Sequence, residues 1–152
     1  MNIFGERQNV EKYIPLLIHS AITGNKVSIH SNSDLSKAGT RFYTYAGYVA
    51  KTVWSIIDKV STDNKDSIRW QSPMYHIVGK REVDNLELAL LVEKIVGKKI
   101  NYELVNFHES RPGHDLRYAL QDNLLNFEQE DFETSLERVV KWYLTNLEWM
   151  GL

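Results

Sequence analysis

The sequence contains no cysteine and no long apolar run. Without cysteine the chain has neither disulfides nor thiolate metal sites, which fits a reducing compartment, and we expect a cytoplasmic protein. The longest apolar runs are far shorter than the roughly 20 residues that cross a bilayer, so no membrane partner is expected. Nothing resembles a signal peptide.

Basic residues are too few and too scattered for nucleic-acid binding. The chain has 18 Lys and Arg against 20 Asp and Glu, a net charge of −2. Because no basic stripe could neutralise many phosphates, nucleic acid is excluded as an expected partner. The 43% hydrophobic and 25% charged content is ordinary for a globular protein, and 152 residues suffice for one domain with a core.

Cofactor and hydrolase motifs are also missing. A dinucleotide site needs a glycine-rich turn through which the pyrophosphate reaches backbone N–H groups, and no Gly-x-Gly occurs among the 8 glycines. The five histidines show no close spacing such as His-x-x-x-His, so we predict no metal site. No Gly-x-Ser-x-Gly is present, which leaves a serine hydrolase unsupported. We expect no cofactor to be bound by this chain alone.

Apolar periodicity predicts helices that alternate with short strands. Helices are expected over residues 9–24, 46–59, 85–96 and from 132, with strands over 27–30, 41–45, 68–78 and 102–106. Pro15 either kinks the first helix or marks its start. In the second helix we expect the apolar residues to face a core, namely Val49, Val53, Ile56, Ile57 and Val60. The alternation indicates an α/β fold.

The most distinctive local motif is Arg111-Pro112-Gly113. Proline fixes φ and glycine accepts a positive φ, so the pair forces a tight turn directly after the arginine. A guanidinium on a pinned backbone presents a rigid donor fork, which suits a phosphate or diphosphate. Because Pro-Gly turns are common and most arginines are solvated, these residues alone favour an ordinary surface turn.

The run Arg-Pro-Gly-His-Asp-Leu-Arg-Tyr-Ala at 111–119 also resembles a signature of the extended short-chain dehydrogenase/reductases, in particular the NAD-dependent epimerases and dehydratases of the dTDP-glucose 4,6-dehydratase type. Asn-Ile-Phe-Gly-Glu-Arg-Gln at 2–8, Glu-Lys-Tyr-Ile-Pro at 11–15 and Trp-Tyr-Leu at 142–144 agree in the same order. The resemblance covers essentially the whole chain. It implies that residues 1–152 are a single domain, the C-terminal sugar-nucleotide-binding part of the extended fold, without the N-terminal Rossmann core that binds NAD.

The resemblance also implies which residues hold a nucleotide-diphosphate sugar. The candidate substrate-binding residues are Asn2, Lys12, Tyr13, Ser28, His30, Arg41, His76, Arg111 and His114. Arg41 stands where the family keeps an arginine that grips the diphosphate, so the pocket would hold this group between Arg41 and Arg111. His30 takes a position that flanks the base. His76 replaces an Asn that touches the ligand, although a lone His beside a strand is more often structural, and Lys12 by itself would be interpreted as a solvated charge.

The catalytic residues of the family have no counterpart here. None of the 8 tyrosines has a Lys four residues later, so the Tyr-x-x-x-Lys pair is missing, and the Thr-Asp-Glu group is missing as well. The family's Arg-Asp-Trp is Arg-Phe-Tyr at 41–43, and its Val-Glu-Asp is Tyr-Ala-Gly at 45–47, which removes two carboxylates. We therefore predict no catalytic residue in this chain.

Three functions remain open. The chain is the nucleotide-sugar-binding portion of an NAD-dependent 4,6-dehydratase or epimerase, inactive alone; or it is half of a split enzyme completed by a separate Rossmann chain; or it is a non-catalytic binding or assembly protein. The resemblance implies that residues 41–58 and 75–79 would pack on the cofactor sheet. We therefore expect exposed apolar surface, and a homo-oligomer where no partner exists.

Overall fold

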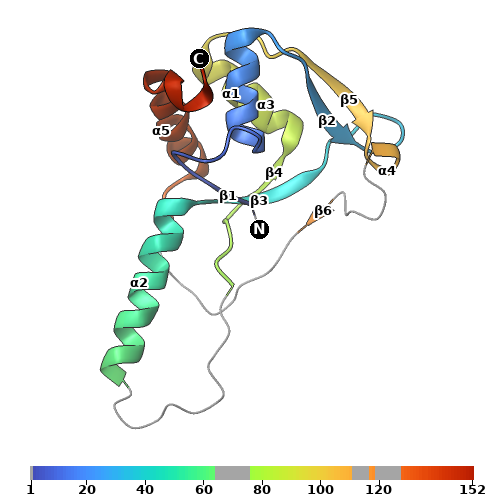
Figure 1. The fold of residues 1–152 in the computed structure, drawn as a ribbon. Helices are drawn as coiled ribbons and strands as arrows, with labels where there is room; N and C mark the ends of the chain where they lie inside the picture. The colour runs from blue at the N-terminus through green and yellow to red at the C-terminus, as the bar shows by residue number, and fades with distance from the viewer. Residues whose placement is uncertain (1, 64–75, 111–116, 119–127) are drawn as a thin grey trace.

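A computed structural model describes residues 2–63, 76–110, 117–118 and 128–152. The elements in chain order are β1 (Asn2–Phe4), α1 (Tyr13–Thr23), β2 (Val27–Ser31), β3 (Thr40–Tyr45), α2 (Ala46–Asp63), β4 (Glu82–Asp84), α3 (Asn85–Val96), β5 (Tyr102–Asn106), α4 (Phe107–Ser110), β6 (Arg117–Tyr118), α5 (Phe132–Thr145) and the 3-10 helix η1 (Leu147–Met150) (Figure 1). This alternation confirms the predicted α/β fold.

β3 is the central strand of the larger sheet. Its second half pairs in parallel with β1, in a register that sets Asn2 opposite Tyr43. Its first half pairs antiparallel with β4 and parallel with β6. β2 and β5 form a separate two-stranded parallel sheet, with Val27 opposite Tyr102. The strands predicted over 27–30, 41–45 and 102–106 are therefore confirmed.

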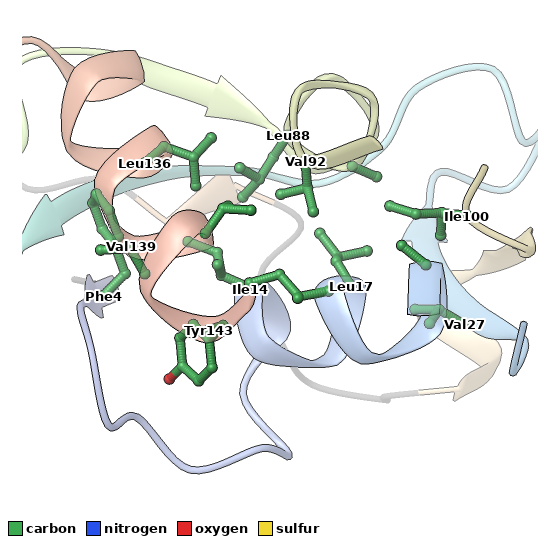
Figure 2. Close-up of a cluster of buried hydrophobic side chains, with 14 of the residues drawn as sticks. Phe4, Ile14, Leu17, Val27, Leu88, Val92, Ile100, Leu136, Val139 and Tyr143 are labelled. Carbon is green, nitrogen blue, oxygen red and sulfur yellow. The ribbon is translucent and has the colours of Figure 1, made fainter. Parts of the chain in front are cut away.

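The core lies among α1, α3 and α5, with Phe4 of β1 packed into it (Figure 2). Apolar residues three and four apart place one face of each helix inward. The fully buried side chains of the three helices include Ile14, Leu17, Ile18, Leu88, Val92, Leu136, Val139, Val140 and Tyr143. Burying each large apolar side chain stabilises the fold by roughly 1.5–3 kcal/mol, so these helices form the stable body of the protein.

The helix ends follow local capping, with one departure from prediction. Asp84 caps α3, and Gly97 ends this helix in the left-handed conformation, so α3 occupies the range predicted for it. α1 begins at Tyr13 instead of near Asn9, because Asn9 closes a turn that precedes the helix: its side chain accepts from the Glu11 N–H (2.8 Å). Pro15 therefore lies in the first helical turn, where no N–H is needed, and marks the start of the helix.

α2 contradicts the prediction of a core-facing side at Val53 and Ile57, whereas Val49 and Ile56 are partly buried. It extends away from the three packed helices (Figure 1), and Val53, Trp54 and Ile57 are 43%, 73% and 52% exposed. Only its beginning lies next to β3, which it follows directly. The exposed apolar surface expected from the resemblance is present. None of the helices in the described ranges, α2 included, has the length and apolar composition to span a membrane.

Candidate functional site

A cleft of about 470 Å³ is formed by residues of β1, α1, β2, β3 and the start of α3. Its lining residues are Asn2, Ile3, Phe4, Gln8, Glu11, Lys12, Tyr13, Ile14, Leu16, Ser28, His30, Gly39, Arg41, Tyr43, Asn85 and Phe107. Ligand pockets commonly measure about 300–1,000 Å³, so the cleft can hold a molecule of nucleotide size.

Most of the predicted site residues meet in this cleft. Its walls include Asn2, Lys12, Tyr13, Ser28, His30 and Arg41. His76 is exposed and is not among the residues that line the cleft. Arg111 and His114 lie outside the described residues. The structure thus collects side chains that are far apart in sequence, while their role in binding stays a prediction.

Two tyrosines converge on Asn85, the first residue of α3. The Tyr13 hydroxyl donates to the Asn85 carbonyl, and the Tyr43 hydroxyl donates to its side-chain Oδ1, both at 2.8 Å. Burial raises the pKa of Tyr43 to about 12. Burial, and then the neighbouring Tyr43 and Asp84, raise the pKa of Tyr13 well above its usual range. Both hydroxyls therefore remain protonated donors at neutral pH and join α1, β3 and α3 at the cleft.

Arg41 and Asn2 lie beside this tyrosine pair. A strand alternates its faces, so Arg41 and Tyr43 share one face of β3. Arg41 is partly buried, and its Nη1 donates to the Thr40 carbonyl (2.7 Å). A hydrogen bond with Asn2 and the charge of Arg41 both oppose the rise in the pKa of Tyr43, the effect of Asn2 being the larger. Arg41 and the exposed Lys12 give the cleft two cations.

β2 supplies the other end of the cleft. Ser28 and His30 are two apart and share one face of this strand. The His30 ring stands edge to face against Phe107, with centroids 5.7 Å apart. Ser28 Oγ donates to Glu103 Oε1 on β5 (3.2 Å), which orients the hydroxyl. Aromatic edges next to hydrogen-bonding groups are suited to a planar ring or a sugar.

β6 lies beside the strand that carries Arg41. It pairs with Thr40 and Arg41 of β3, and it follows the Arg111-Pro112-Gly113 motif in the sequence. Arg117 donates twice to Glu82, from Nε to Oε1 (2.7 Å) and from Nη2 to Oε2 (2.9 Å). The Thr40 hydroxyl donates to Glu82 Oε1 (2.5 Å). These bonds fix β6 next to Arg41.

Sequence reasoning missed several residues of the cleft. Tyr43 could have been found from its spacing, because it shares a strand face with Arg41. Asn85 was placed only at the start of a predicted helix, although its carbonyl and side chain both accept hydrogen bonds from tyrosine hydroxyls at the cleft. Gln8 and Phe107 carry no such signal, since they reach the cleft only through the tertiary fold.

The fold is that of the C-terminal part of the NAD-dependent epimerases and dehydratases. The structure matches the dTDP-glucose 4,6-dehydratase DesIV from Streptomyces venezuelae, solved with NAD and TYD bound, with a TM-score of 0.76 and 26% identity over 97% of this chain and 43% of that chain. UDP-glucuronic acid 4-epimerase from Bacillus cereus, solved with UDP-glucuronic acid and NAD, shares the fold at a TM-score of 0.74 and 18% identity, covering 95% of this chain and 43% of that one.

The sequence is also similar to those of curated proteins. No protein-family model matches the chain. The chain is 30% identical to the dTDP-glucose 4,6-dehydratase of Shigella flexneri over 159 aligned residues, which cover 98% of this chain and 40% of that protein. It thus spans about 40% of the length of the curated relatives it matches. The chain is thus similar, in sequence and in fold, to the C-terminal part of the dTDP-glucose 4,6-dehydratases, in agreement with the resemblance of its motifs.

Proposed function

We propose that this chain is the nucleotide-sugar-binding portion of an NAD-dependent nucleotide-sugar 4,6-dehydratase or epimerase, and that the cleft holds the nucleotide-diphosphate sugar. The observation that carries the proposal is the meeting of Asn2, Lys12, Tyr13, Ser28, His30 and Arg41 around one cavity of about 470 Å³. DesIV, solved with TYD, and the UDP-glucuronic acid 4-epimerase, solved with UDP-glucuronic acid, support the ligand class.

The diphosphate would bind Arg41, with Lys12 across the cleft. Arg111 would supply a second guanidinium group to the same diphosphate. Guanidinium groups bind phosphate oxygens through two parallel hydrogen bonds, and each charge-assisted hydrogen bond contributes about 1.5–3 kcal/mol. Arg111 shortly precedes β6 in the sequence, and β6 pairs with Thr40 and Arg41. Ser28 and His30 would contact the other end of the ligand.

Isothermal titration calorimetry with dTDP-glucose, UDP-glucose and GDP-mannose tests this proposal. We expect saturable binding of at least one of them, weakened about 10–100-fold in Arg41→Ala and in Arg111→Ala, since 1.4 kcal/mol is tenfold in affinity. Arg81→Ala is the matched control, because Arg81 pairs with Glu87 and Glu133 outside the cleft. The proposal would be wrong if no ligand gave a heat of binding, or if Arg41→Ala and Arg111→Ala both bound like wild type.

NAD would be held by a different portion of the complete enzyme. The chain has no Gly-x-Gly turn and no Tyr-x-x-x-Lys pair, so we expect no heat on titration with NAD and no turnover by the chain alone. Supplying a Rossmann portion together with NAD and a nucleotide sugar should yield the 4-keto product. A purely non-catalytic binding role predicts ligand binding without this product, so the assay separates the two functions.

The apolar face of α2 favours a second proposal, in which a separate Rossmann chain docks there and completes a split enzyme. Val53, Trp54 and Ile57 form this α2 face, and large exposed apolar patches are rare on monomers. Without such a partner, the chain should self-associate through the α2 face. Light scattering should then show a dimer or larger species.

Paired substitutions test the role of the α2 face. The double variant Trp54→Ser/Ile57→Ser should be monomeric and should lose complementation by a Rossmann chain. Leu90→Ser is the control, because Leu90 is a comparably exposed apolar residue on α3. A dilute wild-type monomer would contradict self-association, and complementation that survives the double variant would contradict docking at α2.

A further inference from the structure

The C-terminal segment holds the loop at residues 5–12, which joins β1 to α1. The Tyr143 hydroxyl of α5 donates to the Gln8 carbonyl (3.0 Å), with the Gly5 carbonyl 3.4 Å away as a second acceptor. Trp149 Nε1 in η1 donates to the same Gln8 carbonyl (3.2 Å). Figure 2 shows the Tyr143 ring between α5 and this loop. Side chains from the end of the chain thus bind the backbone near its beginning.

The held loop contains a residue with an unfavourable backbone conformation. Arg7 has φ 58°, in the left-handed region that residues other than glycine rarely adopt. Its guanidinium lies over the Trp142 ring of α5, 5.7 Å from the ring centroid. The Tyr45 hydroxyl lies 3.1 Å from both carboxylate oxygens of Glu6. The surrounding contacts therefore determine the path of the loop.

This loop forms one wall of the cleft. The Gln8 side chain donates to the Ile3 carbonyl (2.9 Å), and both residues line the cleft. The Lys12 N–H then donates to the Asn9 carbonyl (3.0 Å), and α1 follows at once. The backbone atoms that Tyr143 holds are therefore only a few residues from Lys12, which lines the cleft.

We propose that Tyr143 is a positioning residue for the nucleotide-sugar cleft, supported by Trp149: without touching the ligand, it fixes the wall that carries Gln8 and Lys12. The inference rests on the proposed function of the cleft. Tyr143 is fully buried, and burial raises its pKa to about 12, so its hydroxyl stays a donor at neutral pH. Its acceptors are carbonyl oxygens, and only a protonated hydroxyl can donate a hydrogen bond to them.

The variant Tyr143→Phe keeps the ring in the core and removes only the donor. We expect an affinity for dTDP-glucose about 3–10-fold lower than wild type by calorimetry, at a temperature where the variant is fully folded, since losing one such hydrogen bond has an effect of this size. We also expect faster amide hydrogen exchange over residues 8–13. Trp149→Phe, which keeps the ring contact with Trp142 and leaves the Tyr143 bond in place, should show the same changes at smaller size.

A control variant separates positioning from simple loss of stability. Val92→Ala creates a cavity in α3, away from the loop, and should lower Tm while leaving the affinity and the exchange of residues 8–13 unchanged. If Tyr143→Phe binds or exchanges like wild type, or if Val92→Ala weakens binding equally, the positioning role is overturned. If the wild type binds none of the nucleotide sugars, the proposed function of the cleft fails instead, and the exchange data alone decide whether Tyr143 fixes the loop.

Discussion

α2 and α3 carry similar apolar periodicity but lie in opposite surroundings. Leu88 and Val92 of α3 are fully buried between α1 and α5, whereas Val53 and Ile57 of α2 are about half exposed. A spacing of three and four residues therefore indicates that a helix face is suited to burial. It does not indicate what covers the face, and for α2 nothing in the described part of this chain does so.

The largest effect that separates the two helices is expected from truncating their apolar residues. Leu88→Ala should lower the free energy of unfolding by about 2–5 kcal/mol, because it leaves a cavity in the core. Ile57→Ala should change it by no more than about 0.5 kcal/mol, as for surface substitutions. Urea denaturation at low protein concentration measures both, and equal losses would show that α2 is packed in this chain.

A smaller effect is expected at the start of α3, where the helix is fixed by its own cap. Asp84 accepts hydrogen bonds from the N–H groups of Leu86 (2.7 Å) and Glu87 (3.1 Å). Asp84→Ala should cost about 1 kcal/mol of stability, and Asp84→Asn, which keeps the acceptor, clearly less. Thermal unfolding of the two variants checks this. An equal loss in both would assign the effect to the charge of Asp84 and not to the cap.

The smallest effect is expected at the exposed pair that joins β4 to β6. Hydrogen bonds from Arg117 and then Thr40 hold the pKa of Glu82 below its usual value of 4.5. Because the folded pKa is the lower one, the pair contributes stability above about pH 4.5 and loses it as the pH falls through the folded pKa. Glu82→Gln should therefore flatten the dependence of Tm on pH below 4.5. Parallel profiles for wild type and Glu82→Gln would contradict this account.

Much of the fold could be predicted from local signals. The short runs at 27–30 and 102–106 predicted β2 and β5, and apolar periodicity predicted α3. The predicted start of α1 was wrong, because Asn9 is as well suited to a turn as to a helix cap. The exposure of α2 was expected only from the resemblance, since apolar periodicity is the same whether the covering surface belongs to this chain or to another.

The cleft was predicted in part, and mainly through the resemblance of its motifs. Lys12 and Ser28 have no local feature that distinguishes them from solvated residues. Asn85 and Phe107 were missed because they meet the N-terminal residues only after α3 and β5 have packed. The sequence motifs thus indicated which side chains could bind a ligand. Only the tertiary fold shows which of these side chains line the same cavity.

The central claim is that this cleft, and not the α2 face, binds a nucleotide sugar. The most direct test is the change in the ¹H–¹⁵N NMR spectrum of the labelled chain on addition of dTDP-glucose, UDP-glucose or GDP-mannose. The account predicts the largest shifts at Tyr13, Ser28, Arg41 and Asn85, with residues 49–58 of α2 unchanged. A spectrum unaffected by all three ligands, or shifts confined to α2, would contradict it.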